Sequence, residues 1–497
     1  MSHLNRGRVF RGYWERAMKG LYASLAIFLL AFPAFGQTYD LVIRGGRVLD
    51  PETGLDGIRD VGISGSKIAA VSAEPLAGAR IIDAHGLVVA PGFIDLHQHA
   101  QDEDSQRLKA FDGVTTALEL EIGSPDVAAF LHKHEGRSLI NYGSSASYVG
   151  ARAAAFNAPL PGEEIFPKSG PATNSVANPG QIGSIQARLE KEIAAGALGI
   201  GVGLQYTPGS TRSEVIHVFR VAARYHLPIY VHVRSGGRTE PGSSVESVSE
   251  VIAAAAITGA PLHIVHINST CLRDTVECLD MVAGARARGL DVSTEAYPYA
   301  AGMTFINSAV FNPGWQEKLE ISYGQLMLPT TGERLTKERF EQLHNSTEQH
   351  EVVIFNNTEE MDDAAIVNPL VMIASDGLAG HPRNAGTYSR VLARYVASQH
   401  SLTLMDAIRK MTLMPAQRLE KATSQARRLG RLQQEAVADI VVFDPAEIHD
   451  RSTYKTPNQP SAGVRYLLVG GMLVIDNGTL TPNLHPGRAI TSAEGNR

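Results

Sequence analysis

The sequence predicts an α/β protein in which a barrel of alternating strands and helices is joined to a small β domain built from both ends of the chain. Short apolar or β-branched runs alternate with amphipathic helical stretches over about 330 residues, which favours a parallel sheet closed into a barrel. Strand-like runs separated by glycine, aspartate and serine turns stand before and after that region. The 497 residues leave room for roughly two to four domains.

The composition is that of a globular protein, with 44% hydrophobic and 19% charged residues. This balance excludes a disordered or fibrous chain. The formal net charge is −6, so the chain lacks the basic surplus that marks nucleic-acid binding. We therefore expect no nucleic-acid partner.

Residues 1–36 have the pattern of a secretory signal peptide. Basic residues between positions 6 and 19 precede an apolar run over 21–35, which ends in a small-x-small site before Gln37. An uncleaved membrane anchor is the alternative, but the run is shorter than the roughly 20 residues of a span and contains Pro33. We expect cleavage near Gln37, a periplasmic or secreted protein, and no membrane span in the mature chain. Met18 is an alternative start.

The small β domain is expected to comprise residues 37–90 and 422–497. Neither part is large enough to bury a core alone, so we expect the two to pack together as one split domain. The strand-like runs lie at 41–43, 47–49, 61–63, 68–71 and 81–82 in the first part, and at 438–443, 464–469 and 472–475 in the second.

Residues 91–421 are expected to form the barrel. Amphipathic helical stretches include 214–225 and 245–258. Residues 305–350 are polar and contain Pro313, Gly314 and Gly332, which indicates an insertion over one end of the barrel. The strand-like runs lie at 93–97, 115–121, 198–204, 229–233, 262–267, 292–296 and 371–375.

The two cysteines, Cys271 and Cys278, are seven positions apart in a helix-like stretch. A helix would separate them by about 10 Å, at 1.5 Å per residue, which is too far for a disulfide. We therefore expect no disulfide between them.

Histidine and aspartate residues stand where predicted barrel strands end, which is where barrel active sites are built. His97 and His99 are two positions apart and so share one face of the first strand. His232 and His266 end strands that are about one strand–helix unit apart, and Asp376 follows the last strand. The pattern predicts a metal site held by these five side chains. His263 is out of phase with His266, so we expect a structural role for it.

A series of short motifs runs through the chain in a characteristic order. They are APGFID before His97, GVTT at 113–116, GALG at 196–199, GLQY at 203–206, SDG at 375–377, HPR at 381–383, PAQR at 415–418 and ADIV at 438–441. Over nearly all of residues 39–480 the chain resembles the amidohydrolase superfamily and, within it, the D-aminoacylase (N-acyl-D-amino-acid deacylase) family. The resemblance implies a metal-dependent (β/α)8 TIM barrel with a small, split β-sandwich domain.

The chain departs from that family at the end of the second barrel strand, where members commonly carry a metal-ligating cysteine. Here residues 117–123 read ALELEIG, with Glu119 and Glu121 on one face of the strand. We expect Glu121 to replace the cysteine as a ligand. Glu119 is the second choice, either as a ligand or as a hydrogen-bond partner of a ligating histidine. Carboxylate is a harder ligand than thiolate, so one or two divalent ions are expected, Zn²⁺ first and Mn²⁺ or Co²⁺ as alternatives.

The resemblance implies a hydrolase acting on carbon–nitrogen bonds other than peptide bonds, with a small N-acyl-D-amino acid as its partner. A metal held by Glu121, His232 and His266 is expected to activate water, with a second ion at His97 and His99. Asp376 is expected to take the proton of the water and pass it to the leaving amine.

A substrate carboxylate requires a cation or a hydrogen-bond donor. Arg383, which matches a family position just after the last strand, is the first choice. Tyr299 and Arg234 are further candidates, and Arg234 is placed to read an acidic side chain. Some family members have a lysine two positions past the sixth-strand histidine, where this chain has Asn268.

Three alternatives stay open. A cyclic amide hydrolase of the dihydroorotase or hydantoinase kind is disfavoured, because many of these enzymes bridge two metals with a carboxylated lysine and no lysine lies between residues 192 and 317. A dipeptidase of the same superfamily is the second. A non-catalytic scaffold is the third, and the retained histidines argue against it. The sequence leaves the oligomeric state open.

Overall fold

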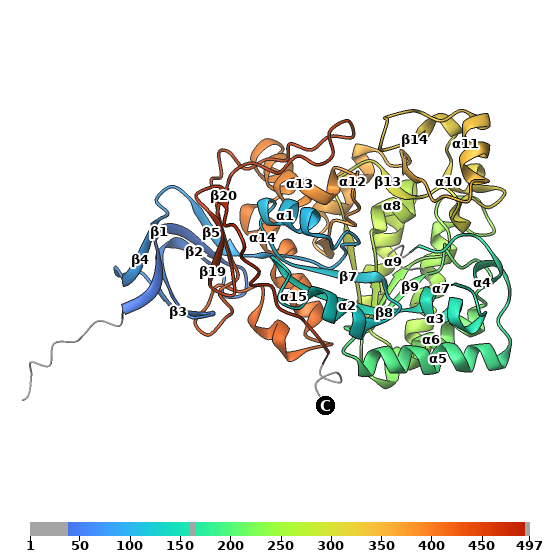
Figure 1. Ribbon diagram of the computed structural model, residues 1–497, viewed down its shortest axis with the longest axis horizontal. Helices are drawn as coiled ribbons and strands as arrows, with labels where there is room; N and C mark the ends of the chain where they lie inside the picture. Colours follow the sequence, from blue (N-terminus) through green and yellow to red (C-terminus); the bar gives the residue numbers. More distant parts are fainter. Residues whose placement is uncertain (1–37, 160–165, 493–497) are drawn as a thin grey trace, which may run out of the picture. The chain divides into compact units, whose positions relative to one another are not determined.

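The structure, a computed structural model, describes residues 38–159 and 166–492. Within them, parallel strands form an eight-stranded sheet, and a parallel bridge between Gln98 and Gly377 joins its first and last strands into a barrel. Figure 1 shows helices surrounding these strands. In sheet order the strands are β6 (Phe93–Asp95), β7 (Val114–Ser124), β8 (Asn141–Ser147), β9 (Ile200–Gly203), β10 (Ile229–His232), β11 (Leu262–Ile264), β12 (Val292–Ala296) and β16 (Val371–Ile373).

The barrel strands are buried along their whole length, so the sheet is covered on both faces, as parallel sheets require. Polar caps start several of the covering helices: Thr211 accepts a hydrogen bond from the Glu214 backbone, and Ser243 from that of Glu246. The helices around the barrel include α1 (Glu103–Phe111), α2 (Val127–His134), α3 (Tyr148–Ala155), α5 (Pro179–Ala194), α6 (Arg212–Arg224), α7 (Ser244–Thr258), α9 (Thr275–Ala287), α12 (Glu359–Val367), α13 (Arg383–Arg390), α14 (Leu404–Met411) and α15 (Leu413–Leu419).

Strands from both ends of the chain share a second sheet. Its central pairing joins β5 (Val88–Pro91) to β17 (Ile440–Phe443) in antiparallel register. The remaining strands are β1 (Thr38–Asp50), β2 (Leu55–Ser64), β3 (Lys67–Ser72), β4 (Ala77–Asp83), β18 (Val464–Val469), β19 (Met472–Asp476) and β20 (Thr479–Leu480). The predicted fold class, a (β/α)8 barrel with a β domain split between the chain ends, is confirmed.

The polar segment between β12 and β16 has a small fold of its own. It contains a three-stranded antiparallel sheet and an apolar cluster around Phe311, Trp315 and Phe340. Its elements are β13 (Gly302–Phe305), α10 (Trp315–Leu319), β14 (Leu326–Met327), α11 (Lys337–His344) and β15 (Glu351–Ile354). This segment brings apolar side chains to the carboxyl ends of the barrel strands, as described below.

The sequence missed β8, whose residues are mostly small and polar. Ser144 and Ser145 donate hydrogen bonds to the backbone carbonyls of Glu119 and Leu120 on β7, so buried hydroxyls are satisfied without apolar side chains. A Cβ atom on Gly143 would lie 2.5 Å from the carbonyl oxygen of Ile490. The C-terminal segment packs closely against β8, which leaves space for small side chains. The sequence of β8 therefore lacks the apolar pattern of the neighbouring strands.

The expectation about the cysteines was wrong: Cys271 and Cys278 form a disulfide. The two do not share one helix, because α8 (Ile267–Cys271) ends at Cys271 and α9 begins at Thr275. Leu272 between them has a positive φ of 51°. The bend brings the two Cα atoms to 6.5 Å, within the usual range for a disulfide.

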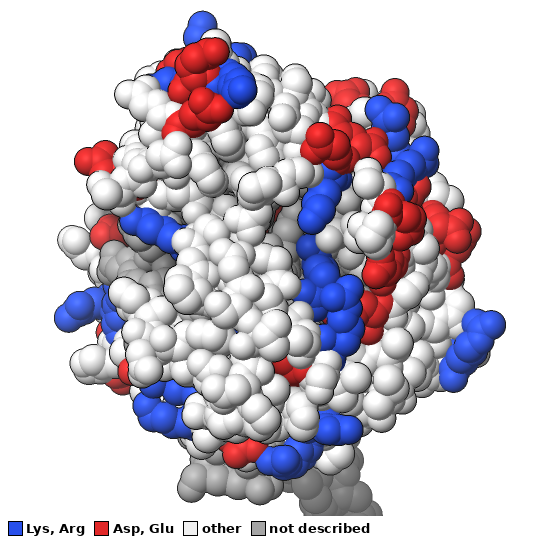
Figure 2. All heavy atoms as spheres, turned by 90° about the vertical axis from the view of Figure 1, so that its right-hand side faces the viewer, with Lys and Arg blue, Asp and Glu red and all other residues white. Residues whose placement is uncertain are grey.

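The expected signal peptide lies outside the described residues. Among the described residues, none of the helices combines the length and the apolar character that crossing a membrane requires. On the face drawn in Figure 2, basic and acidic side chains lie beside one another.

Candidate active site

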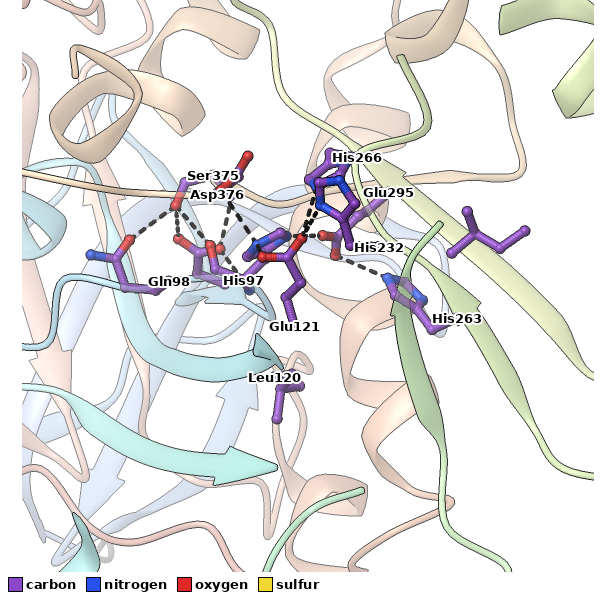
Figure 3. A network of polar contacts seen from close by, with 12 residues as sticks. His97, Gln98, Leu120, Glu121, His232, His263, His266, Glu295, Ser375 and Asp376 are labelled. Atoms are coloured by element: carbon purple, nitrogen blue, oxygen red, sulfur yellow. Dashed lines mark hydrogen bonds and ion pairs between the residues drawn. The ribbon is translucent and has the colours of Figure 1, made fainter. Parts of the chain in front are cut away.

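Six side chains from five barrel strands converge at the carboxyl ends of the strands. Figure 3 labels all of them except His99. His97 and His99 follow β6, Glu121 lies in β7, His232 ends β10, His266 follows β11 and Asp376 follows β16. The potential ligand atoms of His97, His99, Glu121 and Asp376 all lie within 4.8 Å of one another, and so do those of Glu121, His232 and His266. All six residues are buried.

Glu121 belongs to both groups. Its Oε1 lies 2.7 Å from Nδ1 of His232 and 2.9 Å from Nε2 of His266. Its Oε2 lies 3.1 Å from Nε2 of His97 and 3.0 Å from Nε2 of His99. Asp376 contacts the same two histidines: its Oδ1 lies 3.4 Å from Nε2 of His97 and 3.3 Å from Nε2 of His99.

The donor set fits divalent cations. Nε2 of His97 and Nε2 of His99 are 3.1 Å apart, and Nδ1 of His232 and Nε2 of His266 are 3.0 Å apart. Two ligands about 2.1 Å from a tetrahedral ion are separated by roughly 3.4 Å, close to these values. Imidazole and carboxylate ligands suit zinc as well as manganese and cobalt.

Hydrogen bonds on the far side of the rings fix which nitrogen faces the centre. Nδ1 of His97 lies 2.7 Å from Glu295, Nδ1 of His99 lies 2.7 Å from Glu119, and Nδ1 of His266 lies 3.0 Å from the hydroxyl of Thr270. Each partner orients its ring and leaves Nε2 for a ligand. Glu119 thus stands behind His99, while Glu121 stands among the potential ligand atoms.

Glu295 is a site residue that the sequence did not single out. One of its oxygens contacts His97 and the other lies 2.9 Å from Nε2 of His263, so His263 supports the site from outside the potential ligands. The neighbouring histidines, which outweigh the effect of burial, lower the pKa of Glu295 to about 2. Its position near the end of a predicted strand, at 292–296, was the available signal.

The electrostatics keep both central carboxylates ionised. Burial opposes ionisation of Asp376, but Arg383 and His97 outweigh it and lower the pKa of the carboxyl well below its usual range. Burial also opposes ionisation of Glu121, and the surrounding histidines, His97 first, outweigh it and lower its pKa. Burial lowers the pKa of His232, which favours the neutral ring that a metal ligand requires.

Two centre residues have uncommon backbone angles. His266 has φ = 29° and Asp376 has φ = 50°. Such left-handed conformations cost energy and cluster at functional sites. Next to Asp376, the hydroxyl of Ser375 donates to the buried carboxylate of Asp95, which also binds Lys109 at 2.8 Å. This network anchors the turn that presents Asp376.

Arg383 opens α13 directly beside this turn. It is fully buried, with Nη1 2.9 Å from Oδ2 of Asp376 and its guanidinium 4.5 Å from the ring centroid of Tyr297. The contact with Asp376 lacks hydrogen-bond geometry, and within the described residues none of the side-chain nitrogens of Arg383 has a hydrogen-bond partner. Buried guanidinium donors without partners are costly, so this side chain is suited to an anionic ligand.

A small cavity of about 60 Å³ opens at the Glu121, His232 and His266 side of the centre. Its polar lining includes Gln205, whose Oε1 lies 2.6 Å from Nε2 of His232. Its apolar lining comes largely from the segment between β12 and β16, with Met303, Val310, Leu319 and Ile354. Phe166, Tyr206 and Tyr297 also line the cavity.

The structure does not bring Tyr299 or Arg234 into this cavity. The hydroxyl of Tyr299 donates to Asp450 at 3.3 Å, and Tyr297 takes its expected place in the lining. Arg234 makes a bidentate contact with Glu250, at 2.9 Å and 2.7 Å, and lines a neighbouring cavity of about 270 Å³. Its charge is satisfied by a carboxylate on α7, sixteen positions away, which strand patterns could not reveal.

The fold and this centre define a barrel hydrolase of the metal-binding kind. The chain belongs to the amidohydrolase family, whose model matches residues 181–475. It is 30% identical over 493 residues to N-acyl-D-glutamate deacylase from Alcaligenes xylosoxydans xylosoxydans, covering 91% of this chain and 97% of the relative. D-aminoacylase from the same organism is 29% identical over 490 residues, with 91% and 98% covered.

A solved structure supports the fold assignment. N-acyl-D-glutamate deacylase from Bordetella bronchiseptica, complexed with zinc and a phosphonate inhibitor, superimposes with a TM-score of 0.77 at 24% identity. The match covers 92% of this chain and all of that one. The family predicted from the motifs is therefore confirmed.

Proposed function

We propose that the protein hydrolyses the amide bond of N-acyl-D-amino acids, giving a carboxylate and a free D-amino acid. Two buried groups of potential ligands that share Glu121 carry the proposal. Beside them lie the ionised Asp376 and Arg383, whose side-chain nitrogens have no hydrogen-bond partner among the described residues. The near full-length relatives named as deacylases of N-acyl-D-amino acids support the choice of substrate and its D configuration.

Glu121, His232 and His266 would hold one divalent ion, and His97, His99, Glu121 and Asp376 a second. Such ions supply Lewis-acid activation of water and of the amide carbonyl. Zinc is the first choice, with manganese or cobalt as alternatives for a site without thiolate. Glu119, Glu295 and Thr270 hold the histidine rings in the required orientation.

Asp376 would move the proton. Its carboxylate accepts the proton of the attacking water as the new carbon–oxygen bond forms, and donates it to the amide nitrogen as the carbon–nitrogen bond breaks. The low pKa that Arg383 and His97 impose keeps it unprotonated before each turnover. Its place between the two strand-1 histidines and Arg383 puts it next to the reacting groups.

Arg383 would bind the carboxylate of the amino-acid half. Both of its contacts, Asp376 and the ring of Tyr297, line the small cavity, so a substrate anion there would be separated from the guanidinium by no more than these two side chains. The planar guanidinium matches a carboxylate in two-point geometry.

We also propose a periplasmic or secreted location. The signal-like segment at 1–36 and the Cys271–Cys278 disulfide both support an oxidising compartment, because disulfides rarely persist in the cytosol.

The cyclic amide alternative has less support, since β9, the fourth barrel strand, offers no lysine for a carbamate bridge. The test is a substrate panel with metal-loaded protein: N-acetyl-D-amino acids, their L-isomers, D-dipeptides, hydantoins and dihydroorotate. Release of free amine from the D-isomers alone is expected. Turnover confined to cyclic amides, or no turnover with any amide, would overturn the proposal.

A further inference from the structure

A second and much larger cavity, of about 760 Å³, lies beside the centre on the strand-1 side. His99 and Glu119 line it, so it abuts the group formed by His97, His99, Glu121 and Asp376. Phe166 lines both this cavity and the small one, and its ring stacks edge-on against His99 with centroids 5.0 Å apart. Phe166 therefore borders both cavities.

The large cavity has an apolar part to its lining. This part includes Phe130 of α2, Phe166, Phe305 of β13 and Leu378, and the rings of Phe166 and Phe305 are 5.8 Å apart. A space of this size lined by aromatic and aliphatic side chains is typical of a pocket for an organic ligand.

The charges around the large cavity argue against an anion. Asp102, Glu103 and Asp126 are exposed lining residues, and the basic side chain among them is Lys133. Glu351 also lines the cavity. A carboxylate entering here would meet mainly like charges, whereas an uncharged apolar chain would not.

The two halves of the substrate can therefore be assigned. Arg383 contacts two lining residues of the small cavity, so the carboxylate-bearing half belongs on that side. The acyl group leaves the scissile carbonyl in the other direction. The small cavity, on the carboxylate side, has a volume of about 60 Å³, whereas the large cavity has about 760 Å³. Of these two cavities, only the large one has space for a bulky acyl group.

We propose that the cavity lined by Phe130, Phe166, Phe305 and Leu378 binds the acyl group, and that the enzyme prefers aliphatic or aryl acyl groups longer than acetyl. This inference rests on the proposed function. Each buried methylene adds favourable transfer free energy, which corresponds to a gain in kcat/KM of up to about fourfold per methylene until the chain reaches the mouth.

The test is a chain-length series on one amino acid, with formyl, acetyl, butyryl, hexanoyl and octanoyl groups on D-leucine. We expect kcat/KM to rise along the series. Ala129 lines the cavity and Ala128 does not, although both are exposed on α2, so Ala129→Trp and Ala128→Trp are matched variants. Ala129→Trp should lower kcat/KM for the octanoyl substrate at least about tenfold and leave the acetyl substrate unchanged, while Ala128→Trp should change neither.

A second variant tests the apolar lining of the large cavity. Phe305→Ala removes a ring that would contact the chain and should flatten the dependence of kcat/KM on chain length. If acetyl-D-leucine is hydrolysed but longer chains bring no gain, and both variants treat all chain lengths alike, the acyl assignment is wrong and the proposed function stands. If neither the acyl-D-leucine series nor any other N-acyl-D-amino acid of the substrate panel is hydrolysed, the proposed function fails and the acyl assignment with it.

Discussion

Oε1 of Glu121 lies 2.7 Å from Nδ1 of His232, so a carboxylate of the second barrel strand meets an imidazole at the end of the fifth. The other oxygen of Glu121 faces the two histidines that follow the first strand. One carboxylate therefore ties together both potential metal-binding groups.

Glu121→Gln should lower bound metal and activity together by more than about 100-fold, because an amide cannot supply the charge that both groups share. Glu119→Gln should be milder, at about 10- to 100-fold, since Glu119 contacts His99 at the ring nitrogen that faces away from the centre. Metal content by elemental mass spectrometry and kcat/KM give the two readouts. Full metal content with full turnover in Glu121→Gln would remove Glu121 from the ligand set.

Asp376→Asn should lower kcat by about 10²- to 10⁴-fold, the usual contribution of a positioned proton-transfer group. The amide fills the same space but cannot accept the proton. Metal at Glu121, His232 and His266 should be retained and KM should change little. Wholesale loss of metal would make Asp376 chiefly a ligand, and near-normal kcat would remove it from the proton transfer.

Arg383→Met should raise KM for N-acyl-D-amino acids at least about tenfold, because the carboxylate loses its two-point partner. Substrates whose carboxylate is replaced by a carboxamide should be affected far less, which serves as the internal control. An unchanged KM for the carboxylate substrate would place the anion site elsewhere.

Arg383 also affects the pH dependence of activity, through the pKa of Asp376. It lowers the pKa of Asp376, so its removal raises that pKa and Asp376 becomes protonated at higher pH. The acidic limb of the pH profile of kcat/KM should therefore move to higher pH in Arg383→Met. A limb that stays in place would mean that Asp376 is not the group observed.

The Cys271–Cys278 disulfide should stabilise the fold by about 2 kcal/mol, as expected for a short closed loop. Cys271→Ala/Cys278→Ala removes the bond without leaving buried hydroxyls. Its free energy of unfolding in urea should fall by that amount relative to the oxidised protein. Equal stability, together with two free thiols in the unmodified protein, would show that the bond does not form.

Secreted protein should begin near Gln37. N-terminal sequencing of the mature chain checks this, with cytosolic extract as the control fraction. Intact residues 1–36 on protein confined to the cytosol would contradict the proposed location.

The positions of the four histidines and Asp376 at the mouth of the barrel followed from sequence because parallel strands all end on one side. An apolar run that stops at a histidine or aspartate places that residue at the carboxyl end of its strand, whatever its partners are. The same reasoning reached Glu121, because alternation along β7 puts Glu119 and Glu121 on one face.

Tertiary structure decided what depends on partners far away in the chain. The side chains of β8 are mostly small and polar, because its serine hydroxyls donate hydrogen bonds to the backbone of β7 and the C-terminal segment packs against the strand. Glu295 supports His97 across 198 positions, and Arg234 is neutralised by Glu250 on a helix. The cysteines meet because the chain bends at Leu272. Local sequence patterns indicate the position of a residue on its own helix or strand. The features above depend instead on which helices and strands pack together, and only the folded chain brings those partners within bonding distance.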